Sequence, residues 1–267
     1  NGSAFGSRVT VRRTTAVLAA SGFLVSGLVG CSGNSAGQSG TQTQPTVIRV
    51  GVAASMVDVI DKLAINFQQI HPQATIEPTS ASSAVLVTQI EAGAPLDALI
   101  TAGAQVMGQA VDRRLVTAPR AFASNSLEVA IPAANPGQLT GWRDVARPSI
   151  SVARCAAGPP CGTTTDQLLT QNTLTIQVSS LDVDVRAVLT RVRTEQVDAG
   201  IVYVTDVLAA GGSVRGLAIP AVHNVSTTYQ AAVVAGSAHG DIAAQFVDYL
   251  TTASAAEILQ RAGFGPA

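Results

Sequence analysis

The sequence predicts an α/β fold with two lobes, in which each lobe is a mostly parallel sheet flanked by helices. Strand-like and helix-like segments alternate along the chain from Thr46 onward, and this alternation is typical of parallel strands that helices cover on both faces. About 220 residues lie in this region, enough for one large domain or two small ones with complete cores. Because the predicted units fall into two groups, we expect two lobes with a cleft between them.

The first group contains three predicted strands and two predicted helices. In chain order, these elements are expected at 47–52, 56–70, 75–77, 83–92 and 97–101. Apolar residues recur at helical spacing in the first helix, and His71-Pro72 ends it because a helical conformation is disfavoured before proline. Gly93 and Pro95 stop the second helix.

The remaining elements form the second lobe and the connections between the lobes. The second lobe is expected to contain strands and helices at 150–153, 163–170, 185–192 and 199–204. Two strands that cross between the lobes and two helices that return to the first lobe are expected at 127–132, 230–234, 242–250 and 255–261. We therefore expect the first lobe to comprise 46–124 and 232–267, and the second lobe to comprise 125–231.

The N-terminal segment predicts export. Arginines precede an almost uncharged run that ends at Cys31, which is the pattern of a secretory signal peptide over 1–30. The run is shorter than the roughly 20 apolar residues that a membrane-spanning helix needs. The four residues ending at Cys31 are similar to the lipobox of bacterial lipoproteins, so Cys31 is the predicted lipid anchor; the alternative is an ordinary cleaved signal. Residues 31–45 are rich in Ser, Gly and Thr and predict a flexible tether.

The charge balance disfavours nucleic acid and anionic membrane surfaces as partners. The chain has 16 basic and 17 acidic residues, a net charge of −1. Loss of the signal would remove three arginines and leave 13 basic residues against 17 acidic ones, or −4. Binding to nucleic acid depends on a basic surface, which this composition does not provide.

Two cysteines remain after Cys31. Cys155 and Cys161 flank a short loop, and in an exported chain such a pair is most simply a disulfide. No histidine lies near them in the sequence, so we expect no metal site, and their spacing does not match a redox Cys-x-x-Cys motif.

Two serine-rich turns are the strongest functional signal. Ala53-Ala54-Ser55 and the turn 80–83 each follow a strand-like run and open an amphipathic helix. The first N–H groups of a helix have no internal partner, and the helix start carries a partial positive charge. Two such ends facing one another predict a neutral cradle for an anion. The alternative for each serine alone is that it caps its own helix.

Several segments of the chain are similar to those of a known family. They are Val50-Gly51-Val52-Ala53-Ala54-Ser55, Ser82-Ser83, Gln89-Ile90-Glu91-Ala92-Gly93-Ala94-Pro95, Asn125-Ser126-Leu127, Asp184-Val185-Arg186, Gly200-Ile201-Val202-Tyr203 and Ala262-Gly263-Phe264. In this order, across essentially all of 46–267, they resemble the molybdate-binding proteins of bacterial ABC importers. The resemblance implies a two-lobed periplasmic-binding-protein fold of type II, with the ligand in the cleft between the lobes.

The resemblance also implies a set of ligand residues. In that family, hydroxyls and backbone amides hold a tetrahedral oxyanion, without a cationic side chain in contact. The matching positions here are the hydroxyls of Ser55, Ser83 and Tyr203 and the amides of Cys161 and Val185. The chain departs from the family at the cysteine-containing loop 154–162, which many members lack. A backbone donor tolerates such a change of side chain.

The implied function is therefore binding and delivery. We expect a monomeric, extracytoplasmic protein that is anchored to the membrane at Cys31, captures molybdate or tungstate and passes it to an ABC permease. No cofactor and no catalysis are expected. One alternative is a carrier of sulfate or another small anion; phosphate is disfavoured because neither serine turn contains a carboxylate acceptor. A second alternative, a secreted serine hydrolase with His223 or His239 as base, lacks a Gly-x-Ser-x-Gly elbow.

Overall fold

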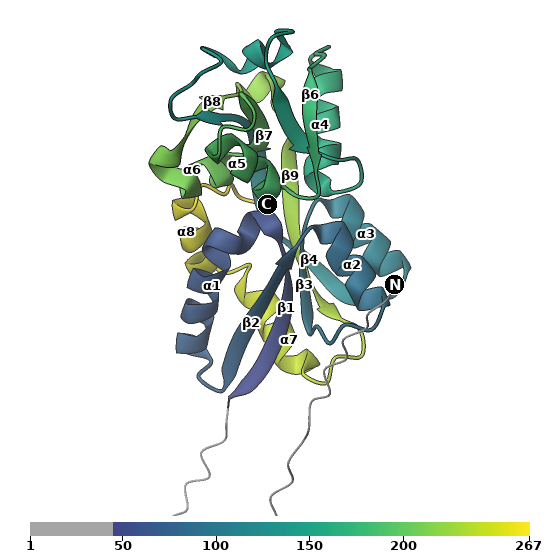
Figure 1. Cartoon of the computed structure of the whole chain (residues 1–267). Helices are drawn as coiled ribbons and strands as arrows, with labels where there is room; N and C mark the ends of the chain where they lie inside the picture. Colours follow the sequence, from purple (N-terminus) through teal and green to yellow (C-terminus); the bar gives the residue numbers. More distant parts are fainter. Residues whose placement is uncertain (1–44) are drawn as a thin grey trace, which may run out of the picture. The chain divides into compact units, whose positions relative to one another are not determined.

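The computed structural model describes residues 45–267 (Figure 1). The predicted signal peptide, the lipid anchor at Cys31 and nearly all of the predicted tether lie outside the described residues. Within the described part, no helix is both long and apolar enough to cross a membrane.

The first part of the sheet is built on parallel strands. The central strand β1 (Thr46–Ala53) pairs in parallel with β2 (Ala74–Ala81) and with β3 (Ala98–Ala102). Helices cover both faces (Figure 1): their bounds are Val57–Ile70 for α1, Ser83–Glu91 for α2, Ala104–Asp112 for α3, Gly240–Tyr249 for α7 and Ala253–Arg261 for α8. One apolar cluster contains Phe67 of α1 and Phe246 of α7, and a second contains Leu86 of α2 and Met107 of α3.

The second part of the sheet has its own core. It comprises β5 (Val152–Cys155), β6 (Val178–Asp182), β7 (Ala199–Tyr203) and β8 (Val214–Ala218), together with α4 (Pro160–Gln171), α5 (Val185–Arg193) and α6 (Val204–Ala210). Strand β5 pairs in parallel with β6 and β7. A third apolar cluster fills this part, with Trp142, Val188 and Ile201 among its members.

Two long strands join the two parts. Strand β9 (Ser226–Val234) is antiparallel to β3 and to the first portion of β4 (Val116–Pro132), whereas the last portion of β4 is antiparallel to β7 and β8. The order across the sheet is β2-β1-β3-β9-β4-β7-β5-β6, with β8 beside β4. The predicted two-lobed α/β fold is confirmed, and the crossing strands make its sheet mixed.

The division at 46–124 with 232–267 and 125–231 remains our proposal. The apolar clusters support it, because helices α7 and α8 pack in the first core and α5 packs in the second. Strand β9 spans the boundary, since its Tyr229 and Ala231 already pack in the first core. We call these parts the first and second lobes.

Candidate functional site

The carboxyl ends of strands from both lobes meet at a small cavity. In the first lobe, β1 and β2 end level with one another, with Ala53 opposite Ala81, so the two serine turns lie at the same edge. In the second lobe, Cys155 at the end of β5 lies opposite Asp182 at the end of β6, and β7 ends at Tyr203. A small cavity lies between these edges.

The cavity brings together all five residues that the sequence nominates as ligands. They are Ser55, Ser83, Cys161, Val185 and Tyr203. Most of the other lining residues are small or apolar, and Asp184 is the only charged one among the described residues. Because no lysine or arginine lines the cavity, an anion bound there would be held by neutral donors.

Ser55 is held by a long-range contact and does not cap a helix. It lies in a 3-10 turn, Ala54–Met56, between β1 and α1, and its side chain makes no capping hydrogen bond. Its Oγ lies 2.7 Å from Oη of Tyr229, which is 174 positions away in the chain. Both side chains are buried.

Ser83 likewise does not cap a helix, because the preceding residue, Ser82, caps α2. The N-cap of α2 is Ser82, whose Oγ accepts a hydrogen bond from the Val85 N–H at 3.4 Å. The Oγ of Ser83 accepts one from the Ala102 N–H at 3.0 Å. A serine hydroxyl that accepts from the protein keeps its own proton to donate. The alternative that Ser83 merely caps its helix is therefore wrong.

The hydroxyl of Tyr203 is buried without a partner. The residue is 1% exposed, and its Oη makes no hydrogen bond to any residue of the described part, 45–267. Burial raises the pKa of Tyr203 above its usual range, so the group stays protonated and neutral. A buried donor without a partner costs about 1–3 kcal/mol, and an oxyanion in the cavity would remove that cost.

Two helix N-termini contribute backbone donors from the second lobe. Cys161 and Val185 lie in the first turns of α4 and α5, where N–H groups have no partner inside the helix. Among residues 45–267, neither amide donates another backbone hydrogen bond. Asp184 caps α5 by accepting from the Ala187 N–H at 2.9 Å, so its carboxylate is engaged by the helix.

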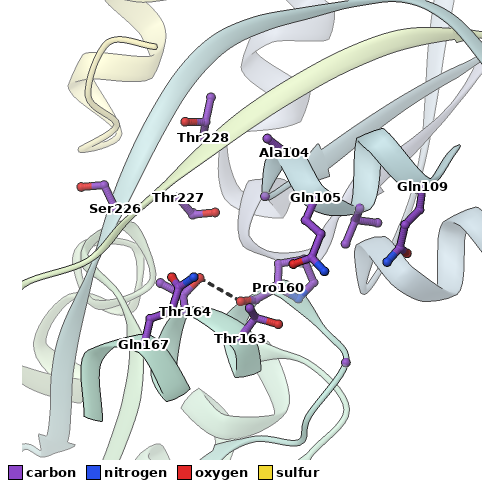
Figure 2. Close-up of a pocket in the computed structure, with 13 residues that line it drawn as sticks. Ala104, Gln105, Gln109, Pro160, Thr163, Thr164, Gln167, Ser226, Thr227 and Thr228 are labelled. Atoms are coloured by element: carbon purple, nitrogen blue, oxygen red, sulfur yellow. Dashed lines mark hydrogen bonds between the residues drawn. The ribbon is translucent and has the colours of Figure 1, made fainter. Parts of the chain in front are cut away.

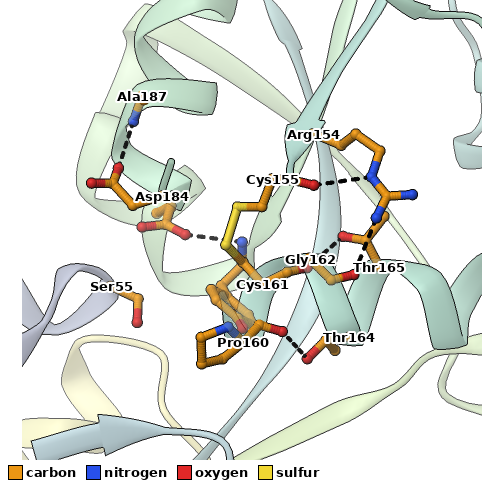
Figure 3. The surroundings of a disulfide bond; sticks show 12 residues. Ser55, Arg154, Cys155, Pro160, Cys161, Gly162, Thr164, Thr165, Asp184 and Ala187 are labelled. Carbon is orange, nitrogen blue, oxygen red and sulfur yellow. Dashed lines mark hydrogen bonds between the residues drawn. A yellow bond between two sulfur atoms is a disulfide. The ribbon is translucent and has the colours of Figure 1, made fainter. Parts of the chain in front are cut away.

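A disulfide and a buried arginine hold the loop before α4 (Figure 3). Cys155 and Cys161 are joined by an S–S bond. Behind them, the Arg154 guanidinium donates to the carbonyls of Cys155 at 3.1 Å and Gly162 at 3.2 Å. It also forms an ion pair with Asp166 of α4. The loop that presents the Cys161 amide is thus fixed at both ends.

Two carboxylates near the cavity were not singled out from the sequence. Asp206 is fully buried and accepts from the Tyr203 N–H at 2.9 Å, and its second oxygen has no hydrogen-bond partner among the residues that the structure describes. Burial raises its pKa to about 7. Asp58 at the start of α1 pairs with Arg186 of α5 at 2.5 Å and so connects the two lobes beside the cavity.

A larger groove adjoins the cavity and shares Pro160 with it (Figure 2). Its polar side chains include Gln105 of α3, Gln167 of α4 and Thr227 of β9, and no charged residue lines it. The groove therefore adds no positive charge beside the cavity. Within the described part of the chain, no cluster of three or more acidic, histidine or cysteine side chains is arranged to hold a metal ion.

The histidines weighed as catalytic bases lie away from the serines. His239 is near Asp97 and Ser237 in the first lobe, and His223 lies beside Trp142 in the second. Neither lines the cavity. The structure therefore assembles no Ser-His-Asp arrangement at Ser55 or Ser83.

The chain matches a known protein family and a curated relative. A family model for bacterial extracellular solute-binding proteins matches residues 48–265. The molybdate-binding protein ModA of Mycobacterium tuberculosis H37Rv is 31% identical over 247 residues, which cover 91% of this chain and 95% of that protein.

Solved structures share the fold. The periplasmic molybdate-binding protein of Azotobacter vinelandii matches with a TM-score of 0.72 at 20% identity, over 81% of this chain and 98% of that one. The sulfate-binding protein SubI of Mycobacterium tuberculosis H37Rv matches with a TM-score of 0.74 at 19% identity, over 83% of this chain and 87% of that one. With a family model that spans nearly all the described residues, the chain belongs to the family of bacterial extracellular solute-binding proteins.

Proposed function

We propose that this protein binds molybdate or tungstate in the cavity between its lobes and delivers the oxyanion to the permease of an ABC transporter. The observation that carries the proposal is the convergence of neutral donors from both lobes on one small cavity. The name of the 31% identical relative, a molybdate-binding protein, supports the choice of ion.

The ligand set that we propose has three hydroxyls and two backbone amides. Ser55 and Ser83 donate from the first lobe, and Cys161, Val185 and Tyr203 donate from the second. The helix starts at α4 and α5 add their partial positive charge to the two amides. Because both lobes contribute donors, the ion binds fully only when the lobes are together, which couples binding to closure.

Calorimetric titration of the purified chain with molybdate, tungstate, sulfate and phosphate tests this function. We expect tight one-to-one binding of molybdate and tungstate and weaker binding of phosphate, because the proton of phosphate needs an acceptor and the carboxylate that lines the cavity, Asp184, already caps α5. Absence of heat with every oxyanion, from a protein shown to be folded by circular dichroism, would rule out the function.

A sulfate carrier is the second candidate. Sulfate has the same charge and shape, and the fold match to a sulfate-binding protein keeps this candidate open. Tighter binding of sulfate than of molybdate in the same titration would decide in its favour.

We further propose that the protein works as a monomer without catalysis and is anchored to the membrane by a lipid on Cys31. Mass spectrometry of the protein from its native membrane, or from a bacterial expression host, should find Cys31 acylated at the new N-terminus. The Cys31→Ser variant should lose the lipid and appear in the soluble fraction. If Cys31 carried no lipid, the N-terminal segment would instead be an ordinary cleaved signal.

A further inference from the structure

One ligand residue is linked to a chain of buried hydrogen bonds that reaches the crossing strands. Ser55 Oγ lies 2.7 Å from Tyr229 Oη on β9. Nδ2 of Asn125, on β4, lies 3.4 Å from the same Tyr229 Oη and 2.8 Å from Thr205 Oγ1. Ser55, Tyr229 and Asn125 are all buried.

The direction of these hydrogen bonds follows from Asn125. Its Oδ1 accepts from the Ser126 N–H at 3.0 Å, so its Nδ2 faces Tyr229 as a donor. Either hydroxyl can donate across the Ser55–Tyr229 contact; we assign the donor to Tyr229, because its oxygen already accepts from Asn125. Ser55, with one lone pair occupied in this way, can direct its proton into the cavity.

The position of Tyr229 is fixed independently of its hydroxyl. Its ring packs edge-on against Phe264 at 5.2 Å and Phe122 at 6.4 Å between centroids. In the β3–β9 ladder it lies opposite Ala102, whose N–H donates to Ser83. The paired residues Tyr229 and Ala102 thus contact Ser55 and Ser83, respectively. Burial also raises the pKa of Tyr229 well above its usual value, which keeps the donor protonated.

We propose that Tyr229 is a positioning residue that makes Ser55 a hydrogen-bond donor to the bound oxyanion. Tyr229 does not line the cavity and acts only through Ser55. The inference rests on the proposed function, since it assigns a role in oxyanion binding. It adds a residue outside the ligand set that tunes the affinity of the site.

A double-mutant cycle with molybdate as the probe tests the inference. Tyr229→Phe keeps the ring and removes the donor, and we expect affinity to fall about five- to tenfold. In a Ser55→Ala background the same substitution should change affinity less than about twofold, because no hydroxyl remains to be positioned. A merely structural role would weaken binding equally in both backgrounds.

Tyr249→Phe is the matched control. Tyr249 also donates one hydrogen bond, to Asn66 Oδ1 at 2.8 Å, and it lies in the first core away from the cavity. Its substitution should leave molybdate affinity unchanged. A loss equal to that of Tyr229→Phe would overturn the inference, because it would show a general effect of losing a buried hydroxyl.

A second variant covers the case in which Tyr229→Phe does not fold. Asn125→Ala removes the donor to Tyr229, and we expect a two- to fivefold loss of affinity that is absent in the Ser55→Ala background. Unchanged affinity, or an equal loss in both backgrounds, would overturn the inference. Failure of the unaltered chain to bind molybdate would instead overturn the proposed function, and the inference with it.

Discussion

At the scale of single residues, we propose that the two serines donate to the ligand because protein groups already engage their oxygens. Ser55 is in contact with Tyr229, and Ser83 accepts from the Ala102 amide. Ser82, one position earlier, does the capping. Adjacent serines in one turn thus have different roles, which the identity of the residues alone does not reveal.

Ser55→Ala and Ser83→Ala should each weaken molybdate binding. Each removes one hydrogen bond to a charged ligand, worth roughly 1.5–3 kcal/mol, so we expect a loss of about ten- to a hundredfold. Ser83→Ala also leaves the Ala102 N–H without its partner and should lower the melting temperature. Calorimetry measures the affinity.

Thr252→Ala is the control for a capping effect. Thr252 caps α8 by accepting from the Ala255 N–H at 3.3 Å, and it does not line the cavity. Its loss should cost about 1 kcal/mol of stability with affinity unchanged. If the Ser55 variant behaved like the Thr252 variant, Ser55 would have only a structural role.

Asp206 predicts a pH dependence of stability. Burial raises its pKa from 3.8 to about 7, so the folded state holds the proton more tightly than the unfolded state. The contribution of Asp206 to the free energy of unfolding is therefore complete below about pH 4 and is lost as pH rises to about 7, by up to about 4 kcal/mol. Asp206→Asn should gain stability relative to the parent between pH 5 and pH 8, as measured by urea unfolding.

The exposed carboxyl of Asp112 supplies the comparison for Asp206. Asp112→Asn should show the same pH profile as the parent, because this residue is exposed on α3. Identical profiles for Asp206→Asn and the parent would mean that the carboxyl ionises freely in the folded protein.

Sequence reasoning could nominate Ser55 and Ser83 because each lies in a turn between a strand and a helix, and the family resemblance added Tyr203. It could not nominate Tyr229, which contacts Ser55 across 174 positions. Alternating strand residues give no local signal of such a contact. Asp206 was missed for a similar reason, since its burial depends on how α6 packs.

At the scale of elements, the start of α4 depends on the loop that precedes it. We expect Cys155 and Cys161 to be oxidised in the exported protein, so a Cys31→Ser variant should show no free thiol under denaturing, non-reducing conditions. The chain-entropy model assigns a loop with a sequence separation of 6 only about 2 kcal/mol. Reduction should therefore leave the protein folded but lower its molybdate affinity, because the disulfide no longer fixes the loop that presents the Cys161 amide. Two free thiols before reduction would contradict the prediction.

Gly162 allows α4 to approach the same loop. A Cβ added there would lie 1.9 Å from the carbonyl oxygen of Ala156, so Gly162→Ala must displace the first turn of α4 and the adjacent Cys161 amide. We expect at least a tenfold loss of molybdate affinity and a lower melting temperature, measured by calorimetry and thermal unfolding.

Gly108→Ala is the matched glycine substitution. Gly108 lies inside α3, and a Cβ there would meet nothing within 4 Å. Alanine should raise stability by up to about 1 kcal/mol and leave affinity unchanged. Equal affinity of both glycine variants would show that the position of α4 does not limit binding.

Strand β4 shows where element prediction fails. Only its last part, 127–132, was predicted, whereas the strand begins at Val116. Residues 117–121 are exposed, Ala118 has a positive φ of 49°, and the register with β9 shifts twice. These irregularities interrupt the alternation of buried and exposed residues by which strands are recognised.

At the scale of the whole molecule, an ion pair joins the two lobes beside the cavity. The Asp58–Arg186 pair is the cross-lobe ion pair at the cavity, and its side chains are 42% and 32% exposed. Exposed pairs contribute about 0–1 kcal/mol. In the proposed function, the oxyanion engages donors from both lobes, so we expect it to contribute more free energy to closure than this ion pair does.

The placement of donors on two separate lobes controls which oxyanions the site selects. Molybdate, tungstate and sulfate share charge and shape, but sulfate is smaller and cannot reach donors that are fixed on two lobes all at once. Each buried donor left unpaired costs roughly 1–3 kcal/mol, so two missed contacts should weaken sulfate binding by about one and a half to four orders of magnitude. Tungstate should bind within a few-fold of molybdate, and competition calorimetry measures both ratios. Equal affinity for sulfate and molybdate would mean that the lobes adjust to the smaller ion, and that the protein is a general oxyanion carrier.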